Sequence, residues 1–230
     1  MKKAIILLSG GLDSAALLAH LLEDRDSGDL ISLSLIYGQK HQKEVKAAVD
    51  IARYYGVKHI VKEIPNIFAG AGSTLIDLDK SNPELTYQQL QDAYGVSPTY
   101  VPFRNGILLS LAAALALVEG AEEVYYGAHA DDSHNYAYPD CTPEFIEAMG
   151  RAINVGTYFK VALFAPWSMK TKQEIVFVGH KLNTPFELTW SCYNGREKAC
   201  GKCPTCINRI EAFKQNNLTD PIPYEIEVEW

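Results

Sequence analysis

The sequence predicts an α/β protein with a doubly wound, mostly parallel five-stranded sheet and a small cysteine-rich unit at its C-terminal end. Short apolar runs of strand type alternate with helical patterns from residue 4 to about residue 182. From residue 190 onward the composition changes to Cys, Gly, Lys and Asn. We therefore expect an α/β domain over residues 1–188 and a C-terminal appendage over 189–230 that packs on it.

The strands are predicted from short apolar runs that end at turns. Because a helical pattern separates each run from the next, we expect parallel strands joined by right-handed crossovers. The predicted strands are residues 3–8, 30–38, 58–64, 122–129 and 160–166.

The helices are predicted from apolar periodicity and from their end signals. Gly56 is a stop signal, and Thr142 followed by Pro143 is a start signal. Residues 66–100 are rich in Gly, Ser, Asn and Pro and are typical of an insertion near a site. The predicted helices are residues 13–23, 40–55, 84–94, 104–120, 142–156 and 170–182.

Composition and charge exclude several classes of protein. With 230 residues, 47% hydrophobic content and 21% charged content, the chain is typical of a globular protein with a large core. A net charge of −7 argues against a general nucleic-acid binder. We see no secretory signal, and the longest apolar run, 107–118, is too short to span a bilayer. A cytoplasmic location is expected.

Polar residues follow three of the predicted strands. They are the segments Ser9–Ser14, Gln39–Glu44 and His129–Asp132. In doubly wound sheets, ligands bind beyond the carboxyl ends of the strands. The shared position of these segments predicts one site.

The stretch SGGLDS, residues 9–14, predicts a phosphate-binding turn between strand and helix. Backbone amides at a helix N-terminus bind anions, and Gly10 and Gly11 let the main chain approach a ligand closely. Ser9 and Ser14 add hydroxyl groups, and Asp13 is placed to cap the helix or to hold a cation. The stretch fits neither the Walker pattern nor the dinucleotide fingerprint. A plain strand-to-helix turn is the alternative.

Four of the five cysteines are spaced C-x7-C-x2-C-x2-C near the C-terminus. Four thiolates match a closed tetrahedral zinc site. A redox dithiol and an iron–sulfur cluster are the alternatives. The candidate zinc ligands are Cys192, Cys200, Cys203 and Cys206.

Basic residues surround these cysteines. We expect them to be solvated surface charges, and the alternative is help in closing a nucleotide site or in contacting a partner subunit. They are Arg196, Lys198, Lys202 and Arg209.

The stretch S-G-G-x-D-S resembles the signature of the PP-loop ATP pyrophosphatases, which share an adenine nucleotide alpha hydrolase-like Rossmann fold. Together with YGQKHQKE, VPFRN, YPDC and LTWSCYNG…CGKCPTC, it resembles the 7-cyano-7-deazaguanine synthase family from residue 4 to about 213. The resemblance implies an ATP-dependent C–N ligase of queuosine biosynthesis that converts 7-carboxy-7-deazaguanine and ammonia into a nitrile. It implies ATP, Mg²⁺ and Zn²⁺ as cofactors, a homodimer, and no direct nucleic-acid or membrane partner.

The resemblance also implies roles for individual residues. Asp13 and Arg104 are the expected catalytic residues, with Arg104 a clamp on phosphate or on the substrate carboxylate; an ion pair with a surface acid is the alternative for it. The expected substrate-binding residues are Asp131, Asp132 and Asp140, although each is as well suited to a cap or an exposed position. The expected ATP-binding residues are Ser9, Gly10, Gly11, Leu12, Asp13, Ser14, Tyr37 and Gln39.

Four further residues have less specific settings. His41 and Glu44 are expected to form an i,i+3 surface pair rather than to face the site. Cys141 is expected to be a small buried residue. Phe103 departs from many family members, which have Gly or Ala at this position, and it either narrows the pocket or packs elsewhere.

Two other functions fit parts of the sequence. A tRNA-thiolation enzyme of the PP-loop type needs a nucleophilic and a resolving thiol outside the metal site, and only Cys141 remains. Another adenylating enzyme of this superfamily would share the loop. A non-catalytic nucleotide-binding zinc module would retain the fold but lack polar residues at the strand ends.

Overall fold

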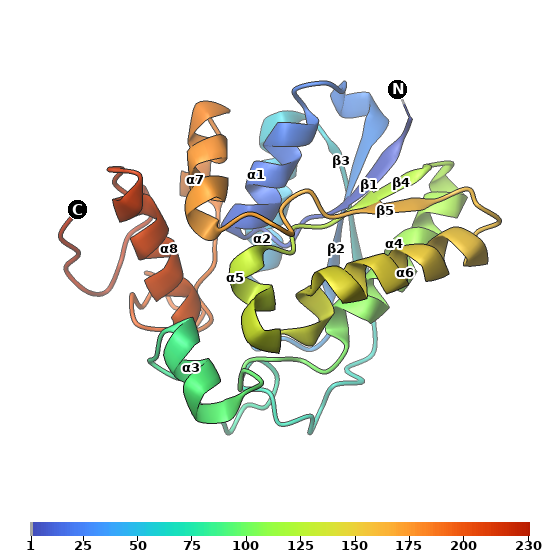
Figure 1. Cartoon of the computed structure of the whole chain (residues 1–230). Helices are drawn as coiled ribbons and strands as arrows, with labels where there is room; N and C mark the ends of the chain where they lie inside the picture. Colours follow the sequence, from blue (N-terminus) through green and yellow to red (C-terminus); the bar gives the residue numbers. More distant parts are fainter. Residues whose placement is uncertain (1) are drawn as a thin grey trace.

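The computed structural model describes residues 2–230, apart from the side chains of Gln91 and Asn135. Its sheet has five parallel strands in the order β3-β2-β1-β4-β5, which confirms the predicted fold class (Figure 1). The strands are β1 Ala4–Leu7, β2 Leu30–Ile36, β3 Lys58–Glu63, β4 Glu123–Tyr125 and β5 Ala162–Phe164.

Helices connect the strands and cover both faces of the sheet (Figure 1). Short 3-10 turns lie at 27–29, 134–136, 139–141 and 186–188. The α-helices are α1 Leu12–Leu21, α2 Lys43–Tyr55, α3 Tyr87–Tyr94, α4 Arg104–Glu119, α5 Ala130–Ser133, α6 Pro143–Gly156, α7 Lys172–Lys181 and α8 Pro204–Gln215.

The two sides of β1 belong to two different apolar cores, because neighbouring residues of a strand point to opposite faces. Ala4 and Ile6 pack in the core that contains residues of α1, α2, α7 and α8. Ile5 packs in the core on the other face, which contains residues of α4 and α6. Ala4, Ile5 and Ile6 are fully buried and Leu7 is partly buried, so both faces of β1 are covered, as its continuous apolar run predicts.

The predicted helix-end signals are confirmed where the structure describes them. The Thr142 hydroxyl caps α6 by accepting from the Phe145 amide at 3.2 Å, and Gly56 ends α2 with a φ of 65°. Thr171 and Glu174 form a reciprocal capping box at the start of α7. These ends are therefore determined by local sequence.

The fourth and fifth strands are shorter than predicted. We expected residues 122–129 and 160–166, but β4 ends at Tyr125 and β5 is only Ala162–Phe164. The two strands are neighbours, and the Tyr126 amide makes the last bond to β5. Residues 127–129 then lead into α5, where the Ala130 amide donates to Lys170.

The C-terminal residues contain a helix that the composition change did not predict. Helix α8 packs against α7, and its Ala212 and Phe213 belong to the same core as α1. Arg209 of this helix is buried, and its guanidinium binds both carboxylate oxygens of Asp220 at 2.6 and 2.8 Å. The expectation of a solvated charge was therefore wrong for Arg209, because its buried carboxylate partner lies eleven residues later.

The order of the strands reverses at β1, which lies between β2 and β4. Such a switch point leaves a crevice beyond the carboxyl end of the strand, since the crossovers on its two sides lead to opposite faces. Residues 9–14 lie at this point. Within the described residues, no helix has both the length and the apolar character of a membrane span.

Candidate active site

The turn after β1 is held together by its serine hydroxyls. The Ser9 amide donates to the Ser14 Oγ at 3.2 Å, and the Gly11 amide donates to the Ser9 Oγ at 3.1 Å. The Ser14 hydroxyl in turn donates to the Gly11 carbonyl at 3.1 Å. Helix α1 begins at Leu12, so the N-terminus of its dipole points into this turn. Leu12 itself is buried in the core and does not face the cavities.

Glycine occupies positions 10 and 11 of the turn for two different structural reasons. Gly10 has a φ of 88°, and a Cβ at this position would collide with the carbonyl oxygen of Glu44. Its own carbonyl accepts from the Trp190 amide at 2.9 Å. A Cβ on Gly11 would meet the Ser9 Oγ at 3.3 Å and would be in ordinary contact with the Trp190 carbonyl at 3.8 Å. Gly10 is therefore needed for packing within the protein, whereas Gly11 lines the aromatic cavity described next, and a side chain there would meet no backbone atom closely.

Two adjoining cavities lie beyond the strand ends. The first, which we call the aromatic cavity, has a volume of about 180 Å³ and is lined by Tyr87, Tyr138, Trp190 and Tyr193. The second, the strand cavity, has a volume of about 210 Å³ and includes apolar residues of β1, β2 and α4 in its wall. The residues that line both are Ser9, Asp13, Tyr37, Gln39, Glu44, Arg104, Asp132 and Cys141.

Asp13 is paired with a buried lysine. The Lys172 Nζ lies 2.6 Å from its carboxylate, and the His129 Nε2 lies 3.8 Å away. Burial opposes ionisation of Asp13, but the attraction of Lys172 and His129 is stronger in sum and holds the pKa of Asp13 below its ordinary value. The His129 Nε2 also lies 3.3 Å from Asp132. Asp13, Lys172, His129 and Asp132 thus form one polar network beside the N-terminus of α1.

Arg104 and Tyr37, which line both cavities, are bonded to each other. The Arg104 guanidinium donates to the Tyr37 hydroxyl at 3.2 Å and to Asn105 at 3.4 Å. Burial disfavours its charge, yet nearby Tyr37 and Asp140 raise the pKa of Arg104 above its ordinary value. Gln39 holds the end of β2 by accepting from the Tyr37 amide at 2.8 Å. Arg104 is therefore not paired with a surface acid.

Asp140 is buried beside the start of α4. Its carboxylate accepts from the Asn105 amide at 2.8 Å, and the Asn105 side chain donates to Cys141 at 3.2 Å. Burial raises the pKa of Asp140, and Arg104 and the Asn105 amide oppose this only in part. Burial also raises the pKa of Cys141 far above its ordinary value, so this thiol stays protonated. Such a thiol is a poor nucleophile.

The structure separates the three acids that the sequence grouped. Asp132 and Asp140 line the aromatic cavity. Asp131 lines neither this cavity nor the strand cavity, and its carboxylate accepts from the Lys172 amide at 3.0 Å and from Asn208 at 3.3 Å. Its contacts join α5 to α7 and α8.

Several residues of the cavities were missed in the sequence. Lys172 follows a predicted strand, as the three polar segments do, and this shared position was a signal for it. The Tyr87, Tyr138 and Tyr193 side chains come from three distant segments with no common pattern. His41 and Glu44 line the aromatic cavity, so the expectation of a surface pair was wrong. The start of α2 and the residues before it lie against the C-terminal segment, where the His41 Nε2 lies 3.2 Å from the Tyr193 carbonyl.

Phe103 packs away from both cavities. Its ring lies edge-on to Phe145 with centroids 5.9 Å apart, and it lines neither cavity wall. The backbone of Phe103 has a φ of 55°, a region in which glycine is unstrained. Phe103 therefore does not narrow the pocket.

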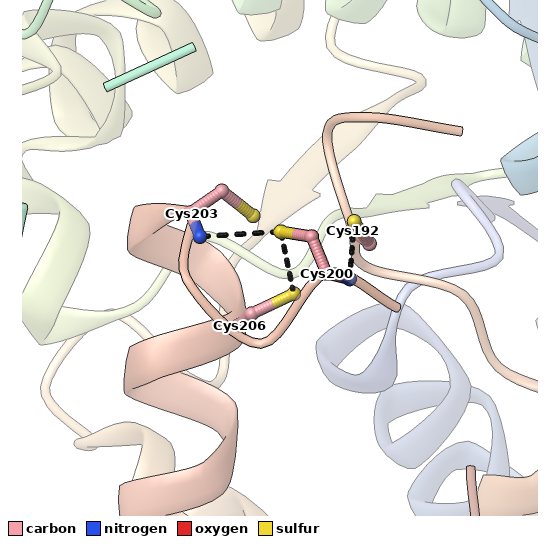
Figure 2. A group of neighbouring side chains, drawn as sticks. All are labelled: Cys192, Cys200, Cys203 and Cys206. Atoms are coloured by element: carbon pink, nitrogen blue, oxygen red, sulfur yellow. Dashed lines mark hydrogen bonds between the residues drawn. The ribbon is translucent and has the colours of Figure 1, made fainter. Parts of the chain in front are cut away.

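The four C-terminal cysteines form one buried cluster (Figure 2). Their Sγ atoms all lie within 4.8 Å of one another, and those of Cys200 and Cys206 are 3.9 Å apart. Amides of Cys200 and Cys203 donate to the sulfur atoms of Cys192 and Cys200 at 3.3 Å each. A tetrahedral ion with bonds of about 2.3 Å separates its sulfur ligands by roughly 3.8 Å. The cluster therefore fits a single metal ion such as zinc.

The chain matches the family model "Queuosine biosynthesis protein QueC" over residues 3–217. A relative from Colwellia psychrerythraea named 7-cyano-7-deazaguanine synthase 1 is 44% identical over 97% of this chain and 99% of its own length. A 7-cyano-7-deazaguanine synthase from Caldicellulosiruptor bescii is 40% identical over 99% of this chain and all of its own length.

The fold also resembles that of a solved structure. The U34-tRNA thiolase NcsA from Methanococcus maripaludis, solved with its [4Fe-4S] cluster, is 15% identical with a TM-score of 0.50, over 94% of this chain and 64% of that protein. At this identity the likeness concerns the fold alone. The match to the family model and to its named relatives over nearly the whole chain is the deciding finding, and the chain belongs to the QueC family of queuosine biosynthesis, whose curated relatives are 7-cyano-7-deazaguanine synthases.

Proposed function

We propose that this chain, as a ligase of the QueC family, uses ATP twice to convert 7-carboxy-7-deazaguanine and ammonia into 7-cyano-7-deazaguanine. The observation that carries the proposal is the junction of two cavities at the anion-binding turn. One cavity suits the nucleotide and the other a flat polar ring, and the turn between them suits the departing pyrophosphate.

The reaction needs activation because a carboxylate is a poor electrophile. Its oxygen attacks the α-phosphorus of ATP, pyrophosphate leaves, and an acyl adenylate forms. Ammonia then displaces AMP, which carries one carboxylate oxygen away, and an amide remains. The amide oxygen attacks a second ATP, and loss of the second AMP with the nitrogen's remaining protons leaves the nitrile. The protein contributes orientation and charge stabilisation.

The proposed nucleotide contacts lie at the ends of β1 and β2. The backbone of residues 9–14 and the two serine hydroxyls bind phosphate, and Lys172 adds a positive charge beside them. Tyr37 and Gln39 meet adenine at the mouth of the strand cavity. Arg104 stands where the two cavities meet and clamps the phosphate or the substrate carboxylate.

The proposed substrate contacts lie in the aromatic cavity. A carboxylate accepts two neighbouring hydrogen bonds, which suits the N–H edge of a guanine-like ring. Asp132 and Asp140 line this cavity, which supports the role for them, whereas Asp131 lines neither cavity and accepts from the Lys172 amide instead. Tyrosine faces offer the ring a stacking surface.

Two metal ions complete the proposal. The four cysteines would hold a structural zinc ion, because all four tetrahedral positions are taken by thiolates and none is open to substrate. Mg²⁺ would accompany ATP, and Asp13 and Asp132 offer the carboxylate oxygens that this ion prefers.

We also propose a homodimer, as the resemblance implies, and a cytoplasmic location. Free thiols are stable in a reducing compartment, which supports the location. Light scattering on the purified, zinc-loaded protein tests the dimer: a mass of about 51 kDa, twice the 25.5 kDa of one chain, is expected, and a mass of one chain contradicts it.

The function is tested by incubating the protein with the deazaguanine acid, ammonia, ATP and Mg²⁺. We expect the nitrile by mass spectrometry, a transient amide, and two AMP for each nitrile. Formation of ADP, or conversion of a different carboxylate with the deazaguanine acid untouched, would contradict the proposal. Sulfur incorporation into tRNA would favour the thiolation enzymes instead.

A further inference from the structure

We infer that Glu44 is the proton acceptor for the attacking ammonia at the junction of the two cavities. This inference rests on the proposed function and adds a catalytic residue to it.

Glu44 lies where the nucleotide and the acid would meet. It is one of the few residues that line both the aromatic and the strand cavity, and Arg104 and Asp13 are others. The carbon that is attacked must be bonded to the α-phosphate through oxygen, so it lies at this junction. A base on the wall there is within reach of the nucleophile.

The backbone of Glu44 is held rigidly. Its carbonyl packs directly on Gly10 of the phosphate turn, and the amide of Ala48 lies over the same glycine. On the other side, Lys43 lies over the ring of Trp190, 4.2 Å from its centroid, and donates to the carbonyls of the C-terminal segment. The first turn of α2 is therefore clamped between the turn and the cysteine-rich segment.

The carboxyl group of Glu44 is unused within the protein. It makes no hydrogen bond or ion pair with any other residue that the structure describes. Burial raises the pKa of Glu44 to about 7, although the Arg104 charge opposes this shift. A base works best when its pKa is close to the working pH. The group is free to take a proton and has the affinity to do so.

The other acids of the cavities are less suited to this task. Asp13 is bound to Lys172 at 2.6 Å, which lowers its basicity. Asp140 already accepts from the Asn105 amide at 2.8 Å. Cys141 stays protonated, and burial lowers the pKa of His41. Glu44 is the carboxyl group at the junction without a protein partner among the residues described.

The proton transfers balance as follows. The nitrogen lone pair of ammonia forms the C–N bond, the C–O bond to AMP breaks, and AMP leaves with that electron pair. The N–H proton that must be lost passes to a carboxylate oxygen of Glu44 and from there to water in the open cavity. In the second cycle the same oxygen accepts protons as the adenylated amide becomes the nitrile.

The test compares wild type with Glu44→Gln, which keeps the shape and loses the base. Adenylation needs no base, so exchange of labelled pyrophosphate into ATP with the deazaguanine acid and no ammonia should stay within about threefold of wild type. Amide formation at saturating ammonia should fall by about 100-fold or more, the usual contribution of a general base. Glu147→Gln, an exposed change on α6, should leave both steps unchanged.

Two further measurements separate a base from a structural role. Hydroxylamine loses its proton more readily than ammonia after attack, so the variant should be less impaired in forming the hydroxamate than the amide. Glu44→Asp keeps the carboxyl group on a shorter side chain. Its rate of amide formation should lie between those of wild type and Glu44→Gln. A rise in the KM for ammonia with an unchanged kcat, or an equal loss of exchange and of amide formation, would overturn the inference.

The outcomes also separate this inference from the proposed function. If wild type neither exchanges pyrophosphate with the deazaguanine acid nor forms the nitrile, the proposed function fails and the inference with it. If wild type does both and Glu44→Gln forms amide at the wild-type rate, only the inference fails.

Discussion

The cysteine cluster and the two strand-end cavities are built in opposite ways. All four thiols of the cluster come from residues 192–206, and its surroundings form a small separate core with Ala199 and Ile222. The two cavities are lined by residues from Leu7 to Thr205, which come from most parts of the fold. A site built from one short segment can be read from spacing, whereas a site built from many segments depends on how the elements pack.

The energetic basis of the two regions differs as well. A core of so few residues buries little apolar surface, so the cluster needs metal bonds for its stability. The cavities lie on a sheet with two large cores and need no ligand to exist. We therefore expect metal removal to unfold one region and ligand removal to leave the other intact.

The largest effect is expected from loss of a cysteine ligand. Cys203→Ser should lower bound zinc from about one ion per chain to nearly none, and should lower Tm by more than about 10 °C, since such sites contribute about 10 kcal/mol to folding in small domains. Metal analysis and calorimetry under reducing conditions measure both. Cys141→Ser, a change of the buried thiol outside the cluster, should leave the zinc content unchanged. If the metal-free protein were as stable as the zinc-loaded protein, the expectation that the cysteine cluster needs metal for its stability would be wrong.

A smaller loss is expected from Lys172→Met, which breaks a contact between distant segments. The variant leaves the half-buried Asp13 carboxylate without its lysine, at a cost of about 3 kcal/mol near neutral pH. In wild type, the lowered pKa of Asp13 stabilises the fold at pH values above the pKa of the unfolded chain, about 4. This stabilisation is lost as the pH falls through the pKa of Asp13 in the folded protein.

In this variant, burial should instead raise the pKa of Asp13, so its stability should fall as the pH rises above about 4. The difference in Tm between wild type and variant should therefore be large at pH 7 and shrink toward pH 4. Thermal unfolding across this range measures it. A difference that does not change with pH would show that the pair is not the source of the effect.

Gly10 and Gly11 allow the same comparison, between packing and ligand binding, to be made inside the turn of residues 9–14. Gly10→Ala should lower the free energy of unfolding by about 2 kcal/mol or more, because it combines a positive φ with a collision at the Glu44 carbonyl. Gly11→Ala should cost less than about 1 kcal/mol and weaken ATP binding by intruding on the cavity. Denaturant unfolding and nucleotide titration separate the two. Equal losses of stability would contradict the assignment of Gly10 to packing.

The smallest effect is expected from Thr171→Ala at the start of α7. Loss of the capping hydroxyl should lower the free energy of unfolding by about 1 kcal/mol, since the Glu174 amide loses its acceptor. Glu174→Gln retains a side chain that can complete the capping box and should cost less. Denaturant unfolding of both variants measures the difference. The reverse order would show that this helix start depends on tertiary contacts.

Much of the fold was predictable because its signals are local. The buried strands and the cap at Thr142 were found in place, as was the stop at Gly56. Helix α8 was missed because the Cys- and Gly-rich segment that precedes it led us to expect no further helix, although its Ala212 and Phe213 face the core. The early end of β4 was missed because it depends on the length of its neighbour.

For the site, the sequence by itself determined the groups whose residues are neighbours in the chain. Such residues must also lie close together in space. These groups are the turn of residues 9–14 at the switch point and the four thiols at a spacing that one ion can bridge. Local backbone geometry and short loops leave such groups few other arrangements.

Only the tertiary structure decided which side chains share the cavities. It brought Lys172 to Asp13 across 159 residues and Glu44 to the cavity wall, and it turned Asp131 toward α7 and α8. These choices depend on crossover connections and on the packing of two helical layers, and no short pattern in the chain encodes them. Segments far apart in sequence acquire a common chemistry only when the sheet places their ends at one edge.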